Sequence, residues 1–476
     1  MSATRRSRPA REAARLARLD DGAALTRFDS LNVHVVLLPE VVDSPDARMT
    51  FLFVVNQCLR FAGAVGVATE DVALATVAAA LAEAIAGAPL SDAAPDITLI
   101  VGDTIVHDRA SVTVNSDGWL ARVATSTGDR THLPAATSAP NALGALAAAC
   151  LGVSQVFHFF AGLPLAGEAE LSLYSFESGA VGALSPDAVD PPLPARIELD
   201  ALFVGCGGVM HGFAYALREL PVFGRARAVD RQRLREQNLG PYVLATLARR
   251  GEKKAEIIRD LLAPNVVVTP YDESFYPLFT TRLDRGHFTL PPTVVAGLDR
   301  VAPRHRVQSL QPELLIDMAA GGETTQLIVK RRGDEGSCVV ELLDRPRDEA
   351  DDLDQLATES GLAAELIRDA MDSPLTADDV ANAPAALRTD MEDARRRGEL
   401  RCGFVRSRAL DHEAEDDEFA AAVPFVVSLA GIVAAATLVR SELEPTGSSR
   451  FQFSFMSLRA APDAPHARGD CDCQRG

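Results

Sequence analysis

Residues 197–255 read IELDALFVGCGGVMHGFAYALRELPVFGRARAVDRQRLREQNLGPYVLATLARRGEKKA. The apolar run at 201–204 predicts a strand, which breaks into GCGG at 205–208. Apolar residues at helical spacing follow, so the stretch predicts a strand, a glycine turn and a helix. Glycines let the backbone approach a ligand, and the amides at a helix N-terminus attract negative charge. This turn therefore favours a bound phosphate.

A second predicted strand, at 226–229, ends in Asp230. A carboxylate roughly 20 residues beyond such a glycine turn can accept hydrogen bonds from a ribose hydroxyl. The dinucleotide fingerprint needs a third glycine where this chain has Met210. A nucleotide-binding unit is therefore favoured, and an NAD-binding dehydrogenase is disfavoured.

Further polar residues follow in a specific order. The pair Asn238-Leu239 comes next, then Lys254 at the head of a predicted helix, and then a strand at 294–298 that ends in Asp299, with Arg304 beyond it. This set, running from residue 205 to residue 304, resembles the ThiF/ubiquitin-activating superfamily, and in particular the bacterial ubiquitin-activating-like enzymes of antiviral operons (Bil type). Those enzymes adenylate the C-terminus of a ubiquitin-like protein.

The resemblance implies an α/β fold with two related ThiF-like (Rossmann-type) adenylation domains, the first inactive and the second active. A helical insertion carries the catalytic cysteine. The expected domains are an inactive adenylation-like domain at 1–170, a linker at 171–195, the nucleotide-binding part of the active domain at 196–341, the cysteine insertion at 342–418 and the rest of the active domain at 419–476.

The resemblance also assigns roles to the nucleotide-binding residues. Gly205, Gly207 and Gly208 are expected to let the backbone pass close under the adenylate. Asp230 is expected to hold the ribose, and Asn238 to line the nucleotide pocket. The alternative is that the glycines form only a tight strand–helix turn and that Asp230 is an ordinary turn residue.

Two charged residues are expected to act on the phosphates. Lys254 is expected to contact them, with Lys253 as an ambiguity of one residue, and Asp299 to hold Mg²⁺ through its oxygens. Arg304 is expected to brace the Asp299 loop. Alone, a lysine in the first turn of a helix is usually solvated and is disfavoured by the helix dipole. A bound anion reverses that argument.

One position departs from the family pattern. Relatives usually carry an arginine for the γ-phosphate at the place where this chain has Pro241. Arg15 and Arg18, in the basic N-terminal segment, are candidates to replace it, because related enzymes draw an arginine from the partner half. Without a replacement, ATP binding is expected to be weaker.

The cysteines divide by their surroundings. Cys58 and Cys150 lie in apolar patterns, and Cys206 lies within the glycine turn, so all three are expected to be packed. Cys402 follows a long polar insertion among arginines, which lower a thiol pKa. We therefore expect Cys402 to be the catalytic nucleophile that accepts the activated chain as a thioester, with Cys338 as the second choice.

Cys338 also belongs to a degraded zinc pattern. Many relatives bind zinc with two Cys-x-x-Cys pairs, and this chain keeps Cys338, Cys471 and Cys473. Glu335, Glu341 or His466 is available to complete the set. The alternative is that the C-terminal tail is disordered and binds no metal.

Composition limits the function further. The chain has 476 residues, 47% hydrophobic content and a net charge of −19, which is typical of a folded protein and argues against nucleic-acid binding. Seven scattered cysteines and the lack of a signal-peptide pattern favour the cytoplasm. The uncharged run 419–439 is long enough to span a membrane. Its proline, serine, glycine and alanine content favours a buried core helix instead.

In the first half, the runs 31–38, 49–55 and 97–101 predict strands, and 141–160 predicts a small-residue helix that resembles 423–439. No glycine turn follows these strands. Prolines in 165–195 indicate a linker. This half therefore reads as an α/β layer without a nucleotide site.

The expected function is adenylation of a ubiquitin-like protein with ATP and Mg²⁺, followed by thioester transfer to a conjugating enzyme in bacterial antiviral defence. Zinc is a further candidate cofactor, a homo-oligomer is compatible with the sequence, and no membrane partner is expected. The alternatives are a sulfur-carrier-protein adenylyltransferase without thioester transfer and a non-catalytic ThiF-like scaffold.

Overall fold

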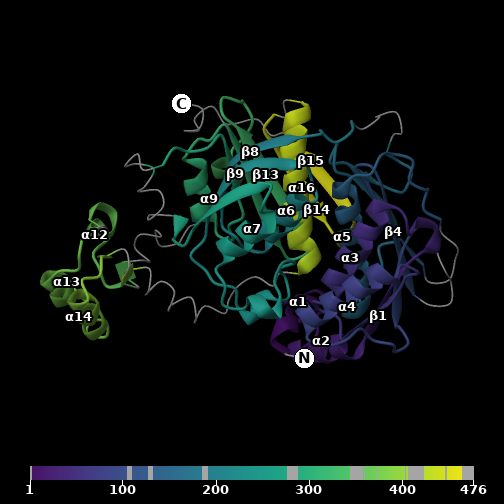
Figure 1. Ribbon diagram of the computed structural model, residues 1–476, viewed down its shortest axis with the longest axis horizontal. Coiled ribbons are helices and arrows are strands. Elements are labelled where there is room, and N and C mark those ends of the chain that lie inside the picture. The colour runs from purple at the N-terminus through teal and green to yellow at the C-terminus, as the bar shows by residue number, and fades with distance from the viewer. Residues whose placement is uncertain are drawn as a thin grey trace.

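The computed structural model describes residues 3–103, 110–126, 132–184, 191–275, 283, 288–343, 357–358, 360–370, 373–401, 404–405, 423–444 and 447–463. Two β-sheets with helices packed around them form the main body (Figure 1). The first half of the chain builds one sheet and the second half builds the other.

The first sheet is parallel from β2 to β4 and antiparallel from β4 to β7. Its strands, in spatial order, are β2 (Ala64–Ala68), β1 (Asn32–Leu37), β3 (Ile97–Val101), β4 (Ser111–Asp117), β5 (Leu120–Ser126), β6 (Glu168–Ser172) and β7 (Ser178–Gly179).

The second sheet is parallel from β10 to β12 and antiparallel from β12 to β15. Its strands, in spatial order, are β10 (Val266–Tyr271), β9 (Val222–Val229), β8 (Ile197–Val204), β11 (Thr293–Ala296), β12 (Leu314–Gly321), β13 (Thr324–Arg331), β14 (Ser449–Ser454) and β15 (Arg459–Asp463).

The two sheets share one topology. The order β2-β1-β3-β4-β5-β6-β7 repeats as β9-β8-β11-β12-β13-β14-β15, with the same parallel and antiparallel pairs, and β10 adds an outer strand to the second sheet. In each, the chain winds outward from a first strand in both directions, as in Rossmann-type folds. The α/β fold class with two related sheets is therefore confirmed.

Helices cover both sheets. In the first half they are α1 (Ala3–Ala17), α2 (Asp21–Ser30), η1 (Pro39–Val41), α3 (Pro45–Cys58), α4 (Val72–Ala86) and α5 (Ala142–Ala161). In the second half they are α6 (Gly208–Arg218), η2 (Glu236–Asn238), η3 (Leu247–Arg249), α7 (Lys254–Leu262), α9 (Val301–Gln308), α10 (Val339–Leu342) and α16 (Pro424–Leu443).

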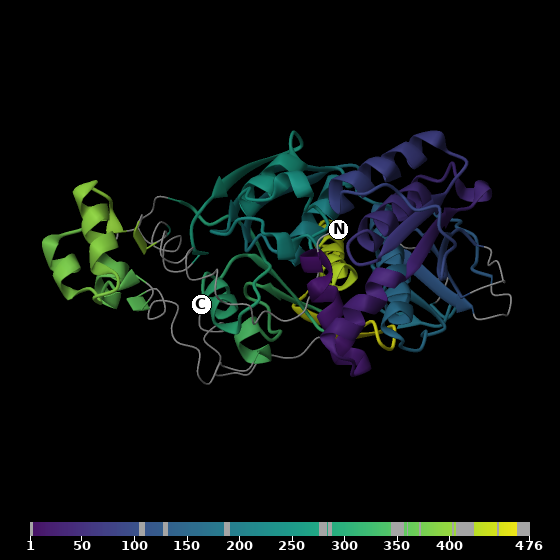
Figure 2. The ribbon, with the colours of Figure 1, turned by 90° about the horizontal axis from the view of Figure 1, so that it is seen from below.

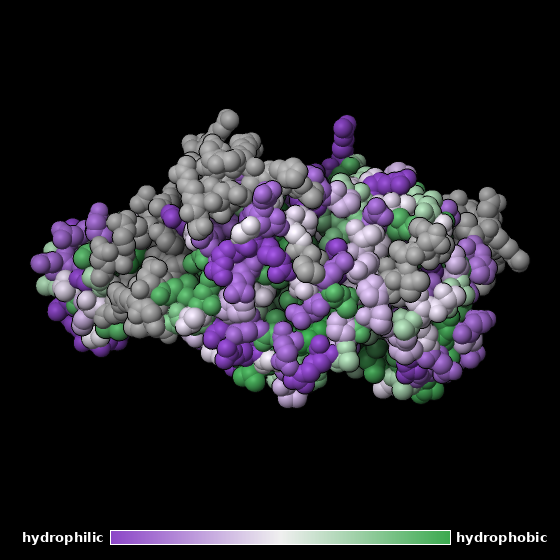
Figure 3. All heavy atoms as spheres, turned by 90° about the horizontal axis from the view of Figure 1, so that it is seen from above, coloured by the Kyte–Doolittle hydropathy of each residue, from purple (hydrophilic) through white to green (hydrophobic). Residues whose placement is uncertain are grey.

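The long helices α5 and α16 lie in the core between the two halves, as Figures 1 and 2 show. Among the described residues, both are long and apolar enough to cross a membrane by length and composition, yet 94% and 89% of their apolar windows are buried in the protein. On the face seen in Figure 3, hydrophilic and hydrophobic side chains are interspersed. Residues 424–439 therefore form a core helix, as expected.

Glycines bring α6 and α16 into backbone contact. A Cβ on Gly431 would lie 2.1 Å from the amide nitrogen of Phe213, and one on Gly212 would lie 2.7 Å from Cα of Ser428. Real Cβ atoms do not approach backbone this closely, so each position needs glycine. This contact fixes α6, and with it the turn that precedes α6.

The structure corrects the strand expected at 49–55. These residues lie within α3, which is buried on all sides and so shows no polar face. The helix begins where the Ser44 side chain accepts a hydrogen bond from the Ala47 amide, with Pro45 in the first turn. These start signals decide the structure over the strand-forming composition of the run.

The first sheet also extends into the expected linker. β6 pairs with β5 and β7 pairs with β6, so part of 171–195 belongs to this sheet. The prolines that suggested a linker lie beyond β7. The division of the chain into active and inactive domains stays a prediction.

Within 342–418, the described residues form short helices with a core of their own. They are α12 (Ala364–Asp369), α13 (Ala377–Asn382) and α14 (Arg388–Arg396). Leu362, Ile367, Leu375 and Met391 are among the residues of this separate apolar cluster. Figure 1 shows these helices apart from the two sheets.

The α6–α16 contact predicts a specific sensitivity. Gly431→Ala should destabilise the protein by roughly 1–3 kcal/mol, because the new methyl group meets backbone that cannot yield. Helix propensity alone would favour alanine, so a loss of stability isolates the contact. Urea denaturation measures it, with Gly321→Ala as the control, since nothing lies within 4 Å of a Cβ at that position. Equal midpoints for both variants would contradict the packing.

Candidate functional site

The glycine turn joins β8 to α6 at the carboxyl edge of the parallel strands. Gly205 has a left-handed backbone (φ +77°), and a Cβ there would lie 2.8 Å from the carbonyl oxygen of Gly297. Gly207 is the N-cap of α6, and Gly208 is its first residue. Backbone amides at this edge are positioned as in the anion sites of open α/β sheets.

Asp230 lies directly after β9, beside the glycine turn. Its Oδ2 accepts a hydrogen bond from the Cys206 amide (2.7 Å), and its Oδ1 accepts one from the Gln232 amide (2.7 Å). Because β8 and β9 are parallel neighbours, both end at the same edge. The structure therefore brings the expected ribose-binding carboxylate to the turn, and the carboxylate also fixes the shape of the turn.

Lys254 is the first residue of α7 and is 3% exposed. Its Nζ donates to Oε1 of Gln232 and, at 3.4 Å, to the hydroxyl of Tyr242. Lys253 instead forms an ion pair with Asp272 at 2.7 Å. The structure thus separates the two lysines that the sequence left ambiguous, and it places Lys254 in the cluster at the glycine turn.

Two aromatic side chains that sequence reasoning missed complete this cluster. The Tyr242 ring lies over Gly208, where an added Cβ would be 3.1 Å from ring carbons. His211 is fully buried, and its ring centroid is 4.8 Å from that of Tyr242. Burial, followed by the nearby Lys254 charge, lowers the pKa of His211 well below its usual range, which keeps the ring neutral. No sequence motif marked either residue.

Asn238 lies at the end of η2 and is 5% exposed. Its Oδ1 accepts a hydrogen bond from the Arg235 amide at 2.9 Å, so the side chain caps its own short helix. The amide nitrogen of Tyr242 donates to the carbonyl of Asn238 at 3.1 Å. Asn238 therefore organises the segment that carries Tyr242 over the turn.

Asp299 follows β11 and is exposed. The preceding Gly297 packs against Gly205 and donates its amide to the carbonyl of Val204 at 2.8 Å. Asp299 therefore lies at the same edge of the sheet as the glycine turn. A single carboxylate there fits Mg²⁺, which takes one or two protein carboxylates together with phosphate and water oxygens.

Arg304 forms a buried, bidentate ion pair with Asp317 of β12, with Nε 3.2 Å from Oδ1 and 3.0 Å from Oδ2. Burial raises the pKa of Asp317, against the opposing effect of Arg304. The pair ties α9, which follows the Asp299 loop, to the second sheet. Arg304 therefore has a structural position.

The two arginines proposed to replace the missing phosphate ligand lie at the end of α1. Arg15 binds Glu12, with Nε 3.0 Å from the carboxylate, and its Nη2 lies over Gly322 in the β12–β13 turn. Arg18 has a left-handed backbone (φ 55°) just beyond the helix. α1 contacts η2, so this helix does lie beside the segment that includes Asn238.

The described cysteines are all buried and free: Cys58, Cys150, Cys206 and Cys338. Burial raises the pKa of Cys150 to about 12, and that of Cys206 well above its usual value. The expectation that these two are packed is confirmed. Cys402 lies outside the described residues, so its role as nucleophile stays a prediction.

The zinc prediction also stays open. Cys471, Cys473 and His466 lie outside the described residues. Across the part of the chain that the structure describes, no group of three or more His, Cys, Asp or Glu side chains is placed to hold a metal. Cys338 caps α10, where its amide donates to Oε2 of Glu341 at 3.2 Å.

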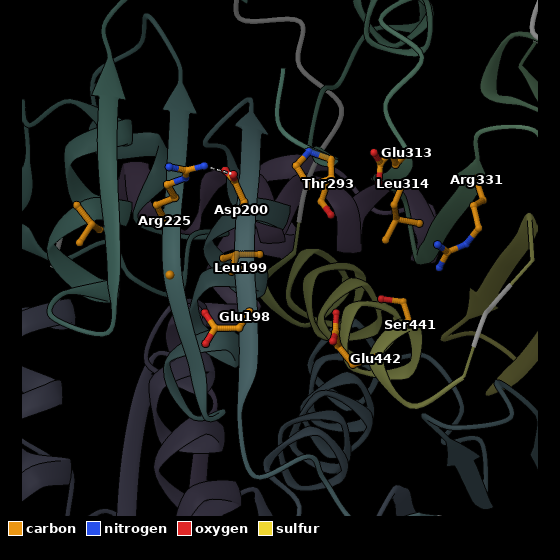
Figure 4. A pocket seen from close by; sticks show the side chains of 13 residues that line it. Glu198, Leu199, Asp200, Arg225, Thr293, Glu313, Leu314, Arg331, Ser441 and Glu442 are labelled. Atoms are coloured by element: carbon orange, nitrogen blue, oxygen red, sulfur yellow. Dashed lines mark hydrogen bonds and ion pairs between the residues drawn. The ribbon is translucent and has the colours of Figure 1, made fainter. Parts of the chain in front are cut away.

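An open pocket of about 800 Å³ lies at the opposite edge of the second sheet (Figure 4). The starts of β8, β9, β11 and β12 and the end of α16 line it. Asp200 and Arg225 form an ion pair at its rim, and Glu198 and Glu442 lie across from them. This pocket is therefore separate from the glycine turn.

Residues 32–174, which run from the start of β1 to just beyond β6, match the family model of the BilD N-terminal domain. The chain carries a BilD N-terminal domain. The match confirms the resemblance to Bil-type proteins in the half of the chain that lacks the glycine turn.

Two other comparisons give similarity over longer stretches. The uncharacterized protein y4jF of Sinorhizobium fredii (strain NBRC 101917 / NGR234) is 28% identical over 272 residues, covering 55% of this chain and 49% of that protein. The chain therefore aligns with about half the length of this relative. A crystal structure of E. coli MccB with MccA-N7isoASN matches with 12% identity and a TM-score of 0.38, over 78% of this chain and 99% of MccB. SeMet PaaA matches with 11% identity and a TM-score of 0.35, over 57% of this chain and 65% of PaaA.

The buried thiols predict a labelling pattern. A short pulse of iodoacetamide at pH 8 should leave Cys58, Cys150 and Cys206 unmodified in the folded protein, because burial keeps them protonated and out of reach. The same pulse in urea should modify all three, as peptide mass spectrometry can measure. Rapid labelling of Cys206 in the folded protein would contradict the packing of the glycine turn.

Proposed function

We propose that the chain adenylates the C-terminal carboxylate of a ubiquitin-like protein with ATP, in a bacterial conjugation pathway of antiviral defence located in the cytoplasm. The observation that carries this proposal is the convergence of the glycine turn, Asp230 and Lys254 at one edge of the second sheet. The BilD N-terminal domain supports the assignment to a conjugation pathway.

The geometry suits the first step. A carboxylate oxygen of the ubiquitin-like protein attacks the α-phosphorus of ATP, and pyrophosphate leaves. Amides at the start of α6 would hold the phosphates, Asp230 would bind the ribose, and the ammonium of Lys254 would stabilise the charge that develops on the transferring phosphoryl group. Asp299 is placed to hold Mg²⁺, which neutralises the leaving pyrophosphate.

The second step needs a sulfur nucleophile. The thiolate of Cys402 would attack the carbonyl carbon of the adenylate, AMP would leave, and the resulting thioester would pass to a conjugating enzyme. One of the cations near Cys402 is less available than the sequence indicated: Arg401 pairs with Asp379 at 3.0 and 3.1 Å. A low thiol pKa would therefore depend on the other arginines of this segment.

A non-catalytic scaffold is the second candidate. Pro241 removes the expected phosphate-binding arginine, and the Tyr242 ring covers Gly208 in its place. A sulfur-carrier adenylyltransferase would form the adenylate without the thioester. The two experiments below separate these functions from each other and from the proposed one.

Lys254→Met should slow ATP–pyrophosphate exchange roughly 10²–10³-fold, as the removal of one preorganised charge-stabilising group does in other enzymes. The assay uses the full chain with the ubiquitin-like proteins of Bil-type operons. Lys253→Met is the matched control, since it removes the neighbouring ammonium, which pairs with Asp272. It should exchange at the wild-type rate. The reverse pattern would move the phosphate contact to Lys253, and no exchange by the wild-type protein would favour the scaffold.

Cys402→Ala should still exchange pyrophosphate with ATP but should form no reductant-labile adduct with the ubiquitin-like protein. Cys402→Ser should trap an oxyester that survives reductant, because the hydroxyl attacks the same mixed anhydride. Gel electrophoresis with and without reductant shows both outcomes. Cys338→Ala is the control and should keep the adduct. Loss of the adduct in Cys338→Ala alone would exchange the two roles, and exchange without any adduct in the wild-type protein would favour the sulfur-carrier function.

A further inference from the structure

A buried arginine of the first half holds the segment 239–245 of the second half. Arg60 follows α3 and is completely buried. Its Nη1 donates to the carbonyls of Leu239 (2.7 Å) and Ala245 (3.2 Å), and its Nη2 donates to that of Val243 (2.6 Å). One guanidinium thus joins the start, the middle and the end of a segment that is far away in sequence.

A neighbouring amide extends this contact. Asn56, one helical turn before Arg60, accepts a hydrogen bond from Nε of Arg60 at 3.0 Å and donates from Nδ2 to the carbonyl of Val243 at 3.2 Å. A buried cation and buried carbonyl groups are each costly without partners. The two halves therefore satisfy one another here, and the loss of Arg60 would leave several carbonyls of the segment unpaired.

The segment that Arg60 holds carries the aromatic wall of the candidate site. Tyr242 lies over Gly208, and its hydroxyl accepts a hydrogen bond from Lys254. The Lys254 ammonium also lies 5.2 Å from the centroid of the Tyr242 ring, within the range of a cation–π contact. A shift of the segment would therefore move a group that contacts both the glycine turn and the lysine assigned to the phosphates.

We propose that Arg60 is a positioning residue of the nucleotide site, and that it acts through Tyr242. The first half, which has no glycine turn of its own, completes the site in the second half by holding the segment 239–245 against that turn and against Lys254. This inference rests on the proposed nucleotide-binding function. It adds that neither half forms the site alone.

The test measures ATP affinity by isothermal titration calorimetry on the full chain with Mg²⁺. Arg60→Met and Tyr242→Ala should each weaken binding about tenfold, which lies in the usual range for coupling between sites. The double variant should bind no more weakly than either single variant, because both changes break the same chain of contacts. Arg60→Lys, which keeps the charge but not the fork of donors, should fall between the wild-type protein and Arg60→Met.

The control is another buried arginine of the first half. Arg122 pairs with Asp117 and Glu170 within the first sheet. Arg122→Met should lower the unfolding midpoint and leave ATP affinity unchanged. Wild-type affinity in folded Arg60→Met would overturn the proposal. Full additivity in the double variant would overturn the route through Tyr242.

Hydrogen exchange provides a readout that does not need ATP. Arg60→Met, or Arg60→Lys if the first variant does not fold, should raise exchange in residues 239–245 and 205–208 while the strands of both sheets stay protected. Unchanged exchange in these segments would overturn the proposal by itself. A failure of the wild-type protein to bind ATP would instead overturn the proposed function, and exchange would still decide whether Arg60 holds the segment.

Discussion

The backbone contact between α6 and α16 is the constraint on which the candidate site depends. Gly431 and Gly212 let the two helices meet without side chains between them. α16 also packs against α5 and β12, so it joins the second sheet to the first half. α6 begins at the glycine turn. Its direction, and therefore the direction of the amides at its N-terminus, is set by a helix that comes more than two hundred residues later in the chain.

The shared topology of the two sheets explains why only one of them offers an anion site. In the second sheet, β8 is followed by glycines and by a helix of 11 residues. In the first sheet, β1 is followed by Leu38, Pro39 and Glu40 and by a single short turn of helix. Proline has no amide hydrogen to donate, and the Glu40 carboxylate repels a phosphate. The same strand order therefore supports two different roles: one sheet presents amides, and the other presents Arg60.

The parts that could be predicted from the sequence are those that depend on local pattern. The strands around the glycine turn, the place of Asp230 and the two apolar helices follow from periodicity and from where each run ends. The run 49–55 was mistaken for a strand, since a helix buried on all sides has no polar face to reveal its period. Arg60 could not be found this way, because it lies 183 positions from Val243 and no motif links them.

Electrostatics connects these features at the centre of the site. Lys254 is buried in the first turn of α7, where both desolvation and the helix dipole disfavour a cation. The oxygens of Gln232 and Tyr242 solvate its ammonium only partly, as dipoles rather than charges. The same charge helps to keep His211 neutral, which avoids a second cation in the cluster. A bound phosphate would offset both costs at Lys254, so the local instability of this lysine is itself an argument for an anion at the glycine turn.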